Sequence, residues 1–296
     1  MTIFQLLLPA FVASLILTGI HAYLGVHVVE RGVIFVDLSL AQIAALGATV
    51  AYLLGNDLHS TTAYLYSLGF TFLGAAIFAL SRVHRQTRIP QEAVIGIVYA
   101  VSAAVAILVM SKATQETEHL KEMLVGNILS VTWPELAKTA VLYAAVGLFH
   151  YIFRKRFLLI SMDEQEAERQ GLNVRFWDFL FYVSFGFVVT SSVAIAGVLL
   201  VFCFLIVPSV TAMLFAERLW ARLAIGWTMG AVVSAGGVAL SFLMDLPTGA
   251  AIVATFGLTL LVLAGVRKAF FKPIGEARAS SSAAPRPTSA PSVSRH

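Results

Sequence analysis

The residues of this sequence that could do chemistry are a few ionisable or amide side chains inside long apolar segments. Asp37 lies six residues after Arg31, in the second apolar segment, and His21 lies in the first segment, ahead of the turn that joins the two. An imidazole and a carboxylate at one depth could bind a divalent cation, which accepts nitrogen and oxygen ligands. Gln42 lies deeper in the second segment and could add an amide oxygen. We therefore predict a metal site made of Asp37, His21 and Gln42.

A structural interpretation stands beside this metal site. His21 and Asp37 reach the same depth if the first two segments form a helical hairpin that turns near residues 28–30. A histidine–aspartate hydrogen bond could then serve only to hold two membrane helices together, and Gln42 could do the same. Glu92 and Asp178 each lie at the start of an apolar segment, where capping and the helix dipole favour acidic residues for structural reasons alone.

The elements that must position these residues are membrane helices. The chain has 296 residues, of which 59% are hydrophobic and 12% charged, and its mean hydropathy is +0.86. Soluble proteins carry about 25% charged residues, so a chain this apolar needs a lipid bilayer to cover it. The net charge of +4 is small and the basic residues lie at the ends of apolar runs, which gives no support for nucleic-acid binding.

Polar and Gly/Pro-rich breaks divide the chain into apolar segments, each long enough at about 20 residues to cross about 30 Å of hydrocarbon as a helix. The sixth and seventh segments, residues 177–195 and 197–216, could be two helices joined by a tight turn near Ala196 and Gly197, or one helix and a short re-entrant piece. We therefore predict an all-α integral membrane protein with a bundle of eight or nine transmembrane helices. The segments cover residues 4–26, 33–54, 61–81, 92–111, 135–153, 177–195, 197–216, 222–244 and 248–266.

The basic residues indicate how this bundle lies in the membrane. With nine crossings and the N-terminus outside, the inner loops hold 17 basic residues and the outer loops hold three. Cytoplasmic loops of membrane proteins are enriched in Lys and Arg, so we predict an outside N-terminus and a cytoplasmic C-terminus. The transmembrane domain should cover residues 1–270. Residues 271–296 are rich in Pro, Ser and Ala and should form a disordered cytoplasmic tail.

The inner loop of residues 154–178 is too elaborate to serve only as a turn. It contains a basic cluster, a short acidic amphipathic segment and Gly171. Helix connections need only about two to eight residues, so we interpret this loop as a docking element for a cytoplasmic protein. Because glycine accepts the left-handed conformation that ends a helix, we predict a short helix that ends at Gly171. The sequence contains no phosphate-binding loop, so an ATP-driven transporter would need a separate ATPase chain.

Five segments match patterns that occur together in one family of transporters. They are QEAVIGI (residues 91–97), LVGNILSVTWPEL (124–136), AERQGLNVRFWDFL (167–180), AGVLLVFCFLIVPSVTAML (196–214) and GVALSFLMDLPTGAAIV (237–253). In this order and spacing they resemble the permease subunit of the metal-ion ABC importers, the group that carries zinc, manganese or iron. The resemblance covers nearly the whole chain, up to about residue 268.

One position departs from the pattern of this family. The second helix of these permeases usually carries Asp-x-x-Ser-His, whose Asp and His are thought to contact the metal. Asp37 matches the aspartate, but the histidine position falls on Ala41, or on Gln42 if one residue is inserted. His21 from the neighbouring helix could supply the missing imidazole.

The resemblance also implies the partners. It implies a homodimer of permeases in the inner membrane, two ATP-binding subunits at the cytoplasmic face and an extracytoplasmic metal-binding protein. The chain would be a multi-pass transporter subunit that works by alternating access, without catalysis or a cofactor of its own. The movement driven by ATP would enter through Glu164, Glu166, Ala167 and Gly171 in the central loop.

Two other classes of membrane protein compete with this prediction. An ion-coupled secondary transporter usually has a coupling-ion site near the midplane and often an internal repeat; the sequence shows no repeat, and Asp37 is the only carboxylate well inside an apolar segment. An intramembrane enzyme would need a paired nucleophile and base, and no such pair is visible. The prediction is therefore an ATP-driven metal permease, with an ion-coupled secondary transporter as the alternative.

Overall fold

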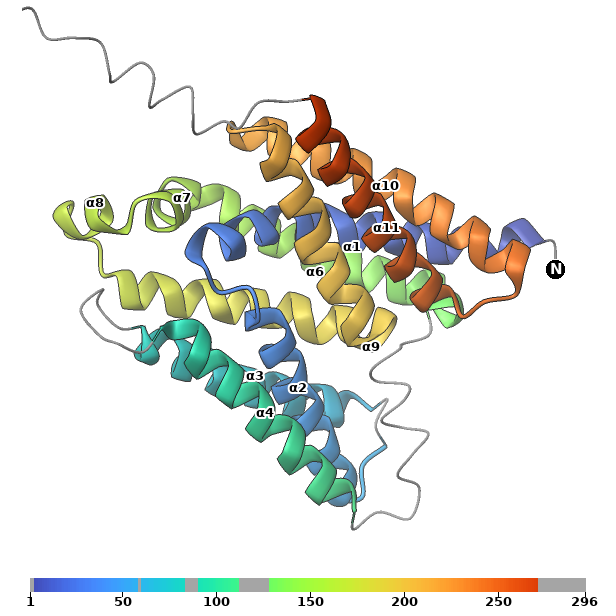
Figure 1. Cartoon of the computed structure of the whole chain (residues 1–296). Coiled ribbons are helices and arrows are strands. Elements are labelled where there is room, and N and C mark those ends of the chain that lie inside the picture. Colours follow the sequence, from blue (N-terminus) through green and yellow to red (C-terminus); the bar gives the residue numbers. More distant parts are fainter. Residues whose placement is uncertain (1–2, 58–59, 83–89, 112–127, 271–296) are drawn as a thin grey trace, which may run out of the picture.

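The computed structural model describes residues 3–57, 60–82, 90–111 and 128–270, and these residues form helices without any β-strand (Figure 1). The predicted all-α class is confirmed. The predicted tail of residues 271–296 lies outside the described residues. The helices are α1 (Ile3–Arg31), α2 (Val36–Leu53), α3 (Thr61–Ser81), α4 (Gln91–Met110), the 3-10 turn η1 (Ile128–Ser130), α6 (Trp133–Ile152), α7 (Arg154–Met162), α8 (Glu164–Arg169), α9 (Val174–Phe215), α10 (Leu219–Met244) and α11 (Thr248–Phe270).

The helices of the described residues are long enough to form a membrane bundle. Seven of them are sufficiently long and apolar to cross a bilayer, and the bent pair α6–α7 makes eight. As a straight helix, α9 with its 42 residues would be about 63 Å long, roughly twice the thickness of the hydrocarbon core. Its backbone instead breaks at Gly197, where φ is 75° and ψ is 162°. The two halves of α9 run in different directions (Figure 1), so the chain bends at Gly197, and the sixth and seventh predicted segments lie in the two halves of one kinked helix.

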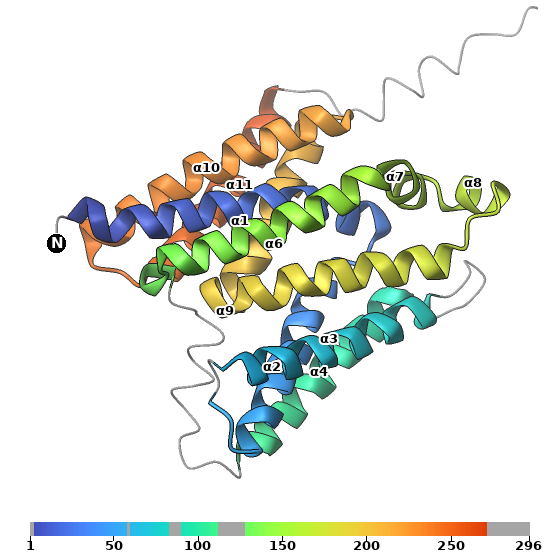
Figure 2. The same ribbon diagram turned by 180° about the vertical axis from the view of Figure 1, so that it is seen from behind.

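The first half of α9 lies between two groups of helices. α2, α3 and α4 pack against one another on one side, whereas α1, α10 and α11 pack together on the other, with α6 beside α1 (Figures 1 and 2). α1 and α2 therefore do not run side by side as a hairpin. α1 continues to Arg31, and the turn is made by residues 32–35, later than predicted, because Gly32 adopts a left-handed φ of 67° there.

Small residues allow the close packing inside the group around α1. A Cβ atom added to Gly25 of α1 would lie 2.1 Å from the carbonyl oxygen of Leu205 in α9, and one added to Gly230 of α10 would lie 2.1 Å from the Cγ2 atom of Thr18 in α1. Apolar side chains alone do not drive helices together in lipid, so close backbone approach matters more than in water.

The short helices α7 and α8 lie at the end of the bundle opposite the N-terminus (Figures 1 and 2). α7 is bent by 75° from the direction of α6, which carries the chain sideways out of the bundle. The end of α1, the end of α3 and the start of α9 meet at this same end, which we call the α8 end. The loop interpreted as a docking element is therefore a helical structure seated on the ends of three long helices.

Candidate coupling site and metal site

The two ends of α8 are fixed by residues next to it in sequence. At its start, the side chain of Asp163 accepts a hydrogen bond from the Glu166 N–H at 3.0 Å. At its end, Gly171 has φ 76°, and the N–H groups of Gly171 and Leu172 donate to carbonyls of the last turn at 2.9 and 3.0 Å. This pair of hydrogen bonds is a Schellman motif. The predicted short helix with a left-handed cap at Gly171 is confirmed.

Most of α8 faces outward. Of the residues predicted to take part in coupling, Ala167 is completely buried and holds α8 against the bundle. Glu164 and Glu166 are partly exposed: Glu164 pairs with Arg82, and an oxygen of Glu166 lies 3.6 Å from an Arg169 nitrogen. An exposed, capped helix held by one small buried residue can present its outer side chains to another protein.

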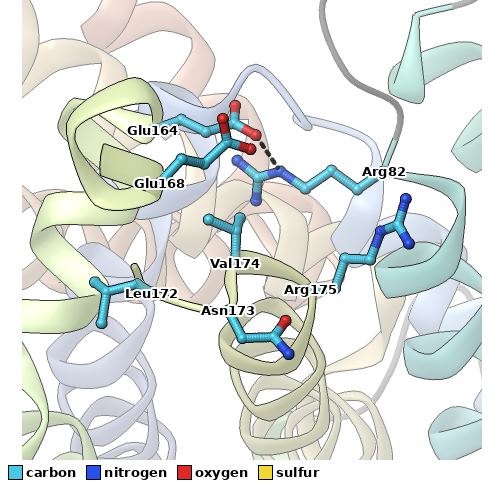
Figure 3. A pocket seen from close by; sticks show the side chains of 7 residues that line it. All are labelled: Arg82, Glu164, Glu168, Leu172, Asn173, Val174 and Arg175. Carbon is cyan, nitrogen blue, oxygen red and sulfur yellow. Dashed lines mark hydrogen bonds and ion pairs between the residues drawn. The ribbon is translucent and has the colours of Figure 1, made fainter. Parts of the chain in front are cut away.

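A pocket adjoins this helix. It has a volume of about 310 Å³ and lies between α8, the end of α3 and the start of α9 (Figure 3). Figure 3 shows Glu164 and Glu168 entering it from α8, with Arg82 reaching toward Glu164 from the other side. Charges of both signs therefore line a concave surface beside the exposed helix. The lining residues are Arg82, Glu164, Glu168, Leu172, Asn173, Val174 and Arg175.

An ion network centred on Asp178 shares Arg82 and Glu164 with the pocket. The Oδ1 atom of Asp178 is 2.6 Å from Nη1 of Arg31, and its Oδ2 atom accepts a hydrogen bond from Nη1 of Arg82. The Nε atom of Arg82 donates to Glu164 at 3.0 Å, and the Nε atom of Arg31 donates to the hydroxyl of Ser161 at 2.8 Å. This network joins the ends of α1 and α3, the start of α9 and the α7–α8 pair.

The sequence did not reveal this role for Asp178. Its position near a helix start suggested capping, but the side chain that caps α9 is Asn173, which accepts from the Phe176 N–H at 3.1 Å. Asp178 neutralises arginines that lie 147 and 96 residues away in the chain, and no local pattern shows such pairs. Burial by itself lowers the pKa of Arg82, but the adjacent carboxylates of Asp178 and Glu164 raise it above its ordinary value, so Arg82 carries its charge throughout the physiological range.

Glu92 also stabilises a helix other than its own. It lies in the first turn of α4, as the capping interpretation requires, and its Oε1 atom accepts a hydrogen bond from the backbone N–H of Phe35 at 3.0 Å. Phe35 is the residue before α2. Glu92 therefore helps to fix the start of the helix that carries Asp37.

Asp37 lies in the first turn of α2 and is buried. Its Oδ1 atom has no hydrogen-bond partner in the part of the chain that the structure describes. A buried carboxylate oxygen without a partner is destabilising by about 1–3 kcal/mol or more. A carboxylate oxygen without a partner is able to bind a cation.

His21 has different neighbours from those expected. Its Nδ1 atom donates to the carbonyl of Leu17 at 2.7 Å, and its Nε2 atom lies 3.2 Å from the hydroxyl of Ser192. Tyr143 hydrogen-bonds to the same serine, and its ring centroid is 6.2 Å from that of His21. Among the described residues no hydrogen bond joins His21 to Asp37, so the simple helix-tying pair is not formed.

Gln42 and Asp37 lie on different sides of α2. The helix is continuous from Val36 to Leu53, so Ala41, four residues after Asp37, lies on the same face as Asp37. At 100° per residue, Gln42 lies about 140° around the helix from Asp37. Gln42 is half-buried. The structure therefore brings together none of the three predicted metal ligands by direct contact.

The described residues thus form an all-α membrane bundle whose two short helices, α7 and α8, lie at one end. The chain belongs to the ABC 3 transport family, whose model matches residues 3–267. This confirms the predicted resemblance.

Individual relatives agree with this family. The chain is 29% identical to the manganese transport system membrane protein MntC of Listeria innocua, over 82% of this chain and 84% of the relative. It is 26% identical to the chelated iron transport system membrane protein YfeC of Yersinia pestis, over 91% of this chain and 87% of the relative. Among solved structures, it is similar to PsaBC from Streptococcus pneumoniae in complex with Fab, with a TM-score of 0.75 and 25% identity, covering 94% of this chain and 96% of the other. The chain is thus a multi-pass permease of an ABC transporter family.

Proposed function

We propose that this chain is the membrane-spanning subunit of an ATP-driven importer of a divalent metal ion, manganese or iron, and that a separate subunit hydrolyses the ATP. The observation that carries the proposal is the family match over residues 3–267. Relatives named for manganese transport and for iron transport align with this chain over 84% and 87% of their own length. The proposed partners are an ATP-binding subunit, an extracytoplasmic metal-binding protein and a second copy of this chain, in the inner membrane.

The α7–α8 pair is the proposed docking element for the ATP-binding subunit. Most of α8 is exposed or partly exposed, α8 is capped at both ends, and the pair lies at the opposite end of the bundle from the N-terminus (Figure 1). With the N-terminus outside, as the basic residues indicate, this end faces the cytoplasm. Glu164, Glu166, Ala167 and Gly171 then lie where a cytoplasmic partner can reach them.

Asp37 is the proposed metal ligand. Its unpartnered Oδ1 atom is available to a dication, whose charge would stabilise the ionised carboxylate in a medium of low dielectric constant. An importer must release its cargo, so a site with few protein ligands suits passage better than the closed four-ligand cage of a structural metal site. For His21 to join the site it would have to leave Ser192, and Gln42 would have to be approached from the other side of α2.

The test is reconstitution with the ATP-binding subunit. The full chain should co-purify with that subunit, and in liposomes ATP hydrolysis should rise when Mn²⁺ or Fe²⁺ and the extracytoplasmic binding protein are supplied. Metal uptake should require ATP and should stop when the subunit's hydrolysis is blocked. Uptake that follows an ion gradient in the absence of ATP would reject the proposal and favour a secondary transporter.

A further inference from the structure

Two arginines and His27, whose Nδ1 atom lies 2.8 Å from the hydroxyl of Ser161, connect polar side chains of the α7–α8 pair to the long helices. Ser161, near the end of α7, accepts a hydrogen bond from Arg31 at the end of α1, and Glu164, at the start of α8, accepts one from Arg82 at the end of α3. Both arginines then bind the single carboxylate of Asp178 in α9. Hydrogen bonds from two residues of the docking element, three positions apart, therefore lead through the two arginines to one buried carboxylate.

We propose that Arg31, Arg82 and Asp178 form a clamp that makes the ends of α1, α3 and α9 move as one body when the ATP-binding subunit displaces α7–α8. The three side chains act as positioning residues, because they pass on the displacement without touching the metal. This inference rests on the proposed function, in which α7–α8 receives the movement of the ATP-binding subunit.

The inner part of the network, Arg31, Asp178 and Arg82, is buried or nearly so, whereas its outer link ends at the partly exposed Glu164. The side chains of Arg31 and Asp178 are 1% and 0% exposed and that of Arg82 is 11% exposed, whereas that of Glu164 is 41% exposed. Separating a buried ion pair leaves an uncompensated charge in a medium of low dielectric constant. Separating an ion pair that water can reach costs far less free energy, because solvent replaces the partner. The clamp therefore holds together while the bond between Glu164 and Arg82 lengthens under the displacement of α8.

The charges give this outer link a restoring force. Within the network the two arginine charges are balanced by the carboxylates of Asp178 and Glu164. When Glu164 moves away with α8, Asp178 alone faces two guanidinium groups, and an unbalanced positive charge is left at the α8 end. That charge attracts Glu164 back, so the network favours the return of α8 to its present position.

The geometry of Arg82 requires a guanidinium group. Its Nη1 atom binds Asp178 while its Nε atom binds Glu164, so one planar group bridges two carboxylates from different helices. Lysine keeps the positive charge but concentrates it in a single ammonium group on a flexible stem. It can neutralise Asp178 without bridging to α8. An Arg82→Lys variant therefore separates charge balance from mechanical connection.

A matched control lies at the same end of the bundle. Arg222, in the first turn of α10, pairs with Glu30 near the end of α1, and its Nε atom donates to the carbonyl of Ala216 at 3.0 Å. The exposures of these side chains, 13% for Arg222 and 24% for Glu30, are similar to that of Arg82. No described hydrogen bond or ion pair connects Arg222 with α7 or α8.

The experiment compares Arg82→Lys with Arg222→Lys in liposomes that contain the full chain, its ATP-binding subunit and the extracytoplasmic binding protein. The measured quantity is the Mn²⁺ uptake rate divided by the ATP hydrolysis rate, taken beside a melting curve. We expect this ratio to fall about two- to fivefold for Arg82→Lys, which is the effect of losing one partly exposed ion pair. The ratio for Arg222→Lys should stay near that of the wild type. Ser161→Ala, which removes the hydrogen bonds of Ser161 with Arg31 and with His27, should also lower the ratio.

Three results would overturn the clamp, and each differs from a failure of the proposed function. An unchanged ratio for Arg82→Lys, with or without a lower melting temperature, would leave Arg82 with a purely structural role. An equal fall in the ratio of uptake to hydrolysis for Arg222→Lys would mean that any weakening of the α8 end lowers this ratio. A normal ratio for Ser161→Ala combined with a low one for Arg82→Lys would remove Arg31 from the clamp. If the wild-type chain itself shows no metal-dependent ATP hydrolysis, the proposed function fails, and the clamp with it.

Discussion

Replacement of Gly171 by valine would test the docking role of α8 through the backbone alone. Gly171 has φ 76°, in the left-handed region. A Cβ atom at this position would meet no other atom within 4 Å, so the first atom of a side chain creates no clash with a neighbour. The effect of the substitution must therefore come from the conformational preference of the new residue.

The magnitude follows from the geometry of the cap. The left-handed conformation is unfavourable by about 1–2 kcal/mol for an ordinary residue, and a β-branched residue lies at the upper end of that range. The cap is held by the hydrogen bonds of the Gly171 and Leu172 N–H groups, each of which contributes about 0.5–1.5 kcal/mol. The conformational penalty of valine therefore offsets most of the free energy that these two hydrogen bonds contribute to closing the last turn. The whole protein stays folded, because the free energy of unfolding is typically about 5–15 kcal/mol.

The assay is the affinity of the purified ATP-binding subunit for the permease in lipid nanodiscs. If the closed turn is the form that docks, a penalty of about 1–2 kcal/mol raises Kd about 5- to 30-fold. Gly171→Ala should fall between valine and the wild type, and Gly171→Asn should stay close to the wild type, because asparagine tolerates the left-handed region. Melting temperatures should change little across the series. Wild-type affinity and wild-type metal uptake for Gly171→Val would refute the docking role assigned to this end of α8.

Three further predictions concern the metal site, the topology and the packing. Asp37→Asn should reduce Mn²⁺ uptake per folded molecule steeply without lowering the melting temperature, since Oδ1 has no hydrogen bond to lose; unchanged uptake would remove Asp37 from the metal path. Single cysteines at Arg169 and Asp57, both exposed, should react with a membrane-impermeant thiol reagent from opposite sides in a cysteine-free background, and labelling of both from one side would disprove the topology. Gly25→Ala should destabilise the protein by about 1–3 kcal/mol through overpacking against α9, whereas Gly19→Ala in the same helix meets no atom within 4 Å and should be neutral or stabilising by up to about 1 kcal/mol. Equal melting temperatures for these two variants would contradict the packing.

The sequence by itself determined the membrane helices and the family. Each predicted segment became a helix or a half of α9, because a run of about 20 apolar residues must span the bilayer with its backbone hydrogen bonds satisfied internally. Gly171 and Gly197 were recognised as helix-ending or helix-breaking residues, and both have positive φ. These features depend on residues near in sequence, so a single chain is enough to read them.

Only the tertiary structure decided which distant residues meet. Gly32 turns the chain so that α2 packs with α3 and α4 rather than along α1, which separates His21 from the expected contact with Asp37. Asp178 takes arginines from the ends of α1 and α3 because the helix ends meet at the α8 end and a buried carboxylate must be paired. Charge and burial determine that a partner is needed. The three-dimensional packing of helices far apart in the chain determines which partner it is.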